Sequence, residues 1–150
     1  MTTAIAASRP TSYWVIAVLA LLWNLLGVAM FCMTLMATPE QLAAMPAEQR
    51  RILDATPGWM QVAYGVAVFG GVLGAIGLLL RKRWAATMFL LSLVGLVVQV
   101  LAAFLVTPAW EVLGPAGLVM PIGLLAIAMF LLSYSRRAAD PRGTSPRLRA

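Results

Sequence analysis

Four long apolar runs constrain this chain more than any other feature of its sequence. They cover about residues 13–36, 59–80, 84–106 and 117–134. A helix needs about 20 residues to cross a bilayer, and each run is close to that length. The hydrocarbon core offers the backbone no hydrogen-bond partners, so a segment that crosses it alone must be helical. The pattern predicts an all-α membrane protein, with a four-transmembrane-helix bundle over residues 13–135.

The composition supports the same fold class. Hydrophobic residues make up 62% of the 150 positions and charged residues only 11%, whereas about a quarter of a soluble domain is charged. Too few charges are present to cover a globule, so lipid must solvate much of the surface. Aromatic residues also stand at the edges of the runs, where amphipathic rings favour the headgroup region. These edge residues are Tyr13, Trp14, Trp59, Trp84, Trp110 and Tyr134.

The basic residues predict how the bundle is oriented. The short link at residues 81–83 is Arg-Lys-Arg, and the segment 136–150 carries five arginines against one aspartate. The link after the third run holds only the acid Glu111. The positive-inside rule therefore places residues 1–12 and the basic tail 136–150 in the cytoplasm. The proline, serine and glycine content of the tail predicts disorder.

The first run has a second interpretation, a cleaved signal peptide that would leave three spans. The apolar part of a signal peptide is usually 7–15 residues long, and this run is longer. The length favours a retained span.

The first external loop shows signs of local helix. Thr38, Pro39 and Glu40 form a helix start, with a hydroxyl cap, a proline at the first position and an acid in the first turn. Pro46 and Glu48 repeat part of this arrangement. We expect short amphipathic helices at the membrane surface or over the bundle mouth. A partly ordered polar connector is an equally open interpretation.

Small residues recur along one face of the second run. Spans associate in lipid through close packing of small side chains, so such a face predicts a helix contact. The contact is with a neighbouring span or with a second copy, which would make a homo-oligomer through span two. The face consists of Ala63, Ala67, Gly70, Gly74 and Gly77.

Five polar residues are candidates for a ligand pocket. One lies near the middle of the first span, and the others lie towards the outer side of the bundle if the second span runs inwards. Amide, phenol and carboxylate groups suit the hydroxyls of a sugar or of a lipid headgroup. A structural role is the other interpretation, in which Asn24 and Gln99 bond to each other or to backbone. The candidates are Asn24, Gln61, Tyr64, Gln99 and Glu111.

The chain lacks the residues that several classes of function require. Histidine is absent and Cys32 is the single cysteine, so the common zinc and haem ligand sets are missing. No nucleophile and base form a recognised pair. The basic residues flank the spans and leave no basic folded face for nucleic acid. We expect no enzyme, no metal, no cofactor and no nucleic-acid partner.

One set of residues is spread over the first three runs and the links between them: Trp23-Asn24 with Gly27, Thr38-Pro39-Glu40, Pro57 with Trp59, Ala67-Val68-Phe69 with Gly71 and Gly74, Leu78 to Arg81, Ser92-Leu93 and Gln99. As a set, these residues resemble a family of small bacterial four-helix membrane proteins that carry the automatic name "sugar transporter". The resemblance covers about residues 13–134 and implies four spans in a bacterial inner membrane. The first hypothesis is therefore a protein that binds or transports a small polar solute, such as a sugar or a lipid. The second is a non-catalytic accessory or assembly subunit of a membrane complex.

Overall fold

A computed structural model describes residues 11–139 of the chain as an all-helical bundle without strands. Its four long helices are α1 (Thr11–Leu35), α4 (Gly58–Leu79), α5 (Ala85–Val106) and α7 (Val119–Ala139). Four helical stretches are long and apolar enough to cross a membrane. The predicted four-helix membrane fold is therefore confirmed, and the chain is a multi-pass membrane protein.

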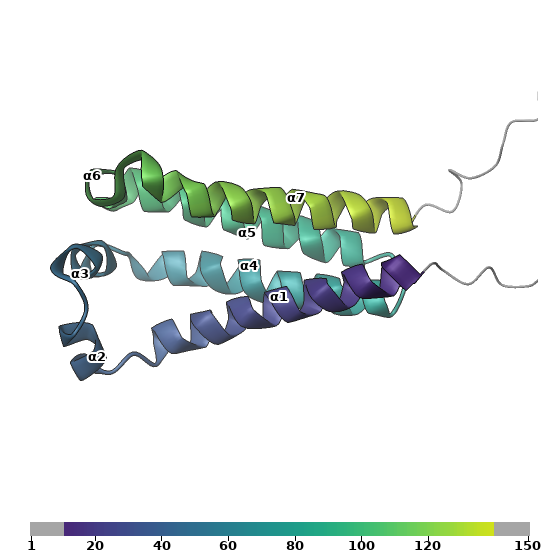
Figure 1. Cartoon of the computed structure of the whole chain (residues 1–150), viewed down its shortest axis with the longest axis horizontal. Coiled ribbons are helices and arrows are strands. Elements are labelled where there is room, and N and C mark those ends of the chain that lie inside the picture. Colours follow the sequence, from purple (N-terminus) through teal and green to yellow (C-terminus); the bar gives the residue numbers. More distant parts are fainter. Residues whose placement is uncertain (1–10, 140–150) are drawn as a thin grey trace, which may run out of the picture.

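The long helices run side by side, and both described chain ends lie at the same end of the bundle (Figure 1). The link at residues 81–83 lies there too, and we call this the basic end. The opposite end carries the short helices and is called the loop end. Residues 1–10 and 140–150, which hold most of the predicted N-terminal segment and tail, lie outside the described residues.

The α4–α5 hairpin is the scaffold of the bundle. Buried residues occur along the whole of α4, where small side chains let α5 approach closely. The turn between the helices is tight. Arg81 has a φ of 55°, and the Lys82 N–H donates to the Gly77 carbonyl at 2.8 Å. This arrangement caps the end of α4 and turns the chain back.

Helices α1 and α7 flank this hairpin without packing against each other along their lengths. Helix α1 packs on α4, and α7 packs on α5. The main core lies at the basic end, where all four long helices contribute to it. It consists of Tyr13, Ala17, Ala20, Ala75, Leu78, Ala85, Phe89, Leu131 and Leu132.

Short helices cover the loop end, as predicted for the first external loop. They are α2 (Pro39–Ala43), α3 (Ala47–Asp54), α6 (Ala109–Leu113) and the 3-10 helix η1 (Gly114–Leu118). A capping box starts α2. The Gln41 N–H donates to Thr38 Oγ1 at 3.3 Å, and the Thr38 N–H donates to Gln41 Oε1 at 3.0 Å. Such reciprocal bonds satisfy two backbone donors at a helix start.

Two features at the ends of α7 correct the prediction. Helix α7 continues to Ala139, so residues 136–139 are helical and do not belong to a disordered tail. Arg136 and Arg137 lie in its last turn, where positive charge is favourable to the helix dipole. At the other end, η1 precedes α7, so the regular helix begins at Val119 and not at residue 117.

Candidate functional site

A cavity of about 230 Å³ lies between all four long helices. Most of its wall consists of aliphatic side chains from α1, α4, α5 and α7. Among the lining residues within 11–139, four carry side-chain polar atoms and none is charged. They are Trp23, Asn24, Tyr64 and Ser92.

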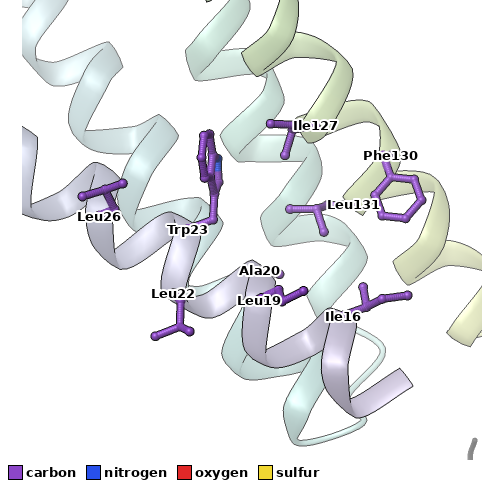
Figure 2. A pocket seen from close by; sticks show the side chains of 9 residues that line it. All are labelled: Ile16, Leu19, Ala20, Leu22, Trp23, Leu26, Ile127, Phe130 and Leu131. Carbon is purple, nitrogen blue, oxygen red and sulfur yellow. The ribbon is translucent and has the colours of Figure 1, made fainter. Parts of the chain in front are cut away.

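A second cavity of about 470 Å³ lies beside the first, between α1 and α7. Figure 2 shows Trp23 standing in the gap between the two helices, with Ile127 and Leu131 of α7 across from it. Both cavities share Trp23, Leu26, Ile127 and Leu131, so they form one depression. We call it the α1–α7 groove. Because α1 and α7 meet at the basic end but have few contacts along the rest of their lengths, the groove faces the surroundings of the bundle, which in a membrane are lipid.

Asn24 joins α1 to the hairpin on the floor of the groove. Its Nδ2 donates to the Ala20 carbonyl of its own helix at 2.7 Å. Its Oδ1 lies directly on Gly71. A Cβ added to Gly71 would overlap Oδ1 and lie 2.7 Å from the Asn24 Cγ. Only glycine leaves room for this approach.

Ser92 reaches the same point from α5. Its Oγ lies 3.3 Å from the position of a Gly71 Cβ, so it stands beside Asn24. The Ser92 hydroxyl donates to the Ala67 carbonyl of α4. Three helices therefore bring polar atoms together near the middle of the bundle. Sequence analysis left Ser92 out of the candidate site, although Ser92 lies on the same face of its helix as Gln99.

Tyr64 lies on the same wall, closer to the loop end. It precedes Gly71 by seven residues, which is about 10 Å along a helix. Its ring packs edge-on against Phe31, with 5.1 Å between the ring centroids. Within residues 11–139 the structure gives no hydrogen bond to the Tyr64 hydroxyl or to the Trp23 N–H.

The other three candidate residues lie elsewhere. Gln61 and Gln99 are half-buried, do not line the groove and have no hydrogen bond to another described residue. Glu111 is exposed and accepts a hydrogen bond from Arg51 at 3.0 Å. The structure thus brings together Asn24 and Tyr64 from the predicted set. Asn24 bonds to backbone and not to Gln99.

The small-residue face of α4 lies against α5 of the same chain. A Cβ on Gly70 would meet the Ser92 backbone nitrogen at 3.2 Å, and one on Gly74 would meet the Phe89 ring at 2.8 Å. From the other side, a Cβ on Gly95 would lie 2.9 Å from the Ala67 nitrogen. A second copy cannot use this face while α5 covers it.

No model of a known protein family, no curated protein and no solved structure matches the chain. The similarity to the family named "sugar transporter" therefore remains a prediction from the residues quoted above.

Proposed function

We propose that this protein binds a lipid of the bilayer in the α1–α7 groove, as a small multi-pass protein of a bacterial inner membrane. One observation carries the proposal. Polar side chains from three helices line a cavity that is otherwise apolar and lies between the membrane-crossing helices. Such a site suits a molecule with a long apolar part and a small polar part.

The position of the groove supports a lipid. The rim residues are lipid-facing, with Met30 of α1 53% exposed and Met120 of α7 75% exposed. A lipid can enter sideways from the bilayer without crossing water. By the positive-inside rule the basic end lies in the cytoplasm, so the part of the groove near Met30 and Met120 would open to the outer leaflet.

The wall chemistry favours a lipid over a sugar. A sugar carries hydroxyl groups around its whole ring, and most of them would face Leu96, Leu124 and Ile127. Each polar group buried without a hydrogen bond costs about 1–3 kcal/mol. A lipid tail meets the same side chains without that cost.

Two alanines of α7 give a matched test. Ala128 lines the groove, whereas Ala126 is exposed and does not line it. We expect native mass spectrometry in mild detergent to show lipid retained by the wild type and by Ala126→Phe, and lost from Ala128→Phe. The phenyl ring fills the groove in only one of the two variants.

Equal lipid retention by both variants would contradict the proposal. A lipid-free protein that is recovered with a second membrane protein would instead support the accessory-subunit hypothesis.

A further inference from the structure

The groove offers three hydrogen-bond donors that bind no described residue. A primary amide has two N–H donors, and Asn24 uses one of them on the Ala20 carbonyl. The Tyr64 hydroxyl and the Trp23 N–H have no bond to another described residue. The Asn24 Oδ1 is covered by Gly71. A ligand with uncharged acceptor oxygens would satisfy these donors best.

The depth of the floor restricts the ligand further. Trp23 and Asn24 lie in the middle of α1, which runs from Thr11 to Leu35. The hydrocarbon core is about 30 Å thick, so a charged headgroup at the surface is about 15 Å away. A ligand group that reaches Asn24 must therefore be uncharged and soluble in the hydrocarbon core. The described residues that line the groove are uncharged as well.

Trp23 adds a flat surface at this depth. Tryptophan in membrane proteins favours the headgroup level, but this ring stands mid-span between α1 and α7 (Figure 2). A planar ring in the groove could pack against the indole, and such aromatic pairs favour offset or edge-on geometry. The Trp23 side chain also gives the groove its own fluorescent reporter.

We infer that the groove binds a lipid quinone, a neutral isoprenoid lipid whose flat ring carries two carbonyl groups. This inference rests on the proposed function and names its ligand class. Asn24 touches α4 at Gly71, and Gly71 lies about 10 Å from Tyr64 along that helix. A ring with carbonyl oxygens on opposite edges can link them by two hydrogen bonds of about 2.9 Å. The isoprenoid tail then lies between α1 and α7.

The test is a fluorescence titration of purified protein with ubiquinone that carries two isoprene units. Geraniol, an alcohol with a tail of the same length, serves as the comparison and is measured by its ability to displace the quinone. We expect the quinone to quench tryptophan fluorescence saturably and to bind about tenfold more tightly than geraniol. Trp23→Phe should remove most of the saturable quenching.

The Tyr64→Phe variant tests the donor argument directly. Its quinone affinity should fall about five- to tenfold, the loss typical of one hydrogen bond, while its geraniol affinity stays the same. Tyr134→Phe is the matched control, because Tyr134 does not line the groove.

Equal affinities for quinone and geraniol, or no effect of Tyr64→Phe, would overturn the quinone inference. If Ala128→Phe still abolished the binding of both molecules, the lipid groove itself would stand. Binding of neither molecule, in a protein that also retains no lipid, would overturn both proposals.

Discussion

The two ends of the bundle pack differently, although the same four helices form both. At the basic end, α1 buries Tyr13, Ala17 and Ala20, and α7 buries Leu131, Leu132 and Ser135. Beyond these residues neither helix has a buried position, whereas the α4–α5 hairpin has buried residues along its whole length. The flanking helices are therefore fully buried only towards the basic end. Farther along the bundle α1 still contacts α4 through Asn24 and Phe31, and the groove follows the gap between α1 and α7.

The side chains explain this difference. At the basic end small residues such as Ala17 and Ala75, both 0% exposed, allow the helices to approach closely. The Tyr13 hydroxyl donates to the Leu78 carbonyl and ties α1 to the end of α4. Towards the loop end α1 instead presents bulky side chains, including Leu26 and Met30, at the edge of the groove.

The largest effect should come from separating the two scaffold helices. A Cβ on Gly95 would lie 2.9 Å from the Ala67 nitrogen and 3.0 Å from the Ala63 carbonyl oxygen. Backbone atoms cannot rotate away, so we expect Gly95→Ala to destabilise the protein by about 1–3 kcal/mol. Thermal unfolding in detergent measures this. Gly123→Ala is the control, since a Cβ there meets nothing within 4 Å. Equal unfolding midpoints for the two variants would contradict the close packing of α5 against α4.

The next effect concerns the hydrogen bond that ties α1 to α4 at the basic end. Tyr13→Phe removes the hydrogen bond to the Leu78 carbonyl, and a bond of this kind contributes about 0.5–1.5 kcal/mol. We expect a lower unfolding midpoint, with no comparable change for Tyr134→Phe. If Tyr13→Phe were as stable as the wild type, the hydrogen bond would contribute nothing and only ring packing would hold α1 to α4 at this end.

Much of this fold could be predicted from hydropathy and small-residue spacing. The predicted spans at 13–36 and 84–106 differ from α1 and α5 by at most two residues at either end, because lipid requires an uninterrupted helix there. The end of the last helix was harder to predict. Residues 136–139 are helical even though arginines and alanines alone do not require it.

The site could be predicted only in part. Asn24 and Gln99 have equal polar character in the sequence, yet one lies in the groove and the other lies outside it. Ser92 lines the groove from the same face of α5 as Gln99, so the difference depends on how far along the bundle the groove extends. Contacts between residues distant in sequence, such as Asn24 with Gly71, determine that extent.

A smaller effect should follow from the bond between Ser92 and Ala67 near the middle of the hairpin. Ser92→Ala removes it, and side-chain hydrogen bonds between membrane helices contribute about 0.6 kcal/mol on average. Ser133→Ala is the matched control, because the Ser133 hydroxyl bonds within its own helix. We expect a small loss of stability only for Ser92→Ala. A larger loss for Ser133→Ala would contradict this assignment.

The smallest effect should come from the ion pair at the loop end. Arg51 and Glu111 link α3 to α6, but their side chains are 62% and 68% exposed. Exposed pairs of this kind contribute at most about 1 kcal/mol and are screened by salt. In a double-mutant cycle with Arg51→Gln and Glu111→Gln, we expect a coupling that disappears at high salt. A large coupling energy that persisted at high salt would mean that this ion pair stabilises the loop end as strongly as the core stabilises the basic end.

The open groove itself can be tested through Trp23 with brominated lipids, which quench tryptophans that they touch. The protein would keep Trp23 alone, with Trp14, Trp59, Trp84 and Trp110 changed to phenylalanine. A lipid-exposed standard at the same depth would carry its tryptophan at Val94, which lies in the middle of α5 and is 51% exposed. If α1 and α7 leave the groove open, bromines near the ends of the acyl chains should quench Trp23 nearly as strongly as the standard, and more strongly than bromines near the headgroup. Little quenching at either depth would show that α7 or a partner closes over Trp23, and would contradict a groove open to lipid.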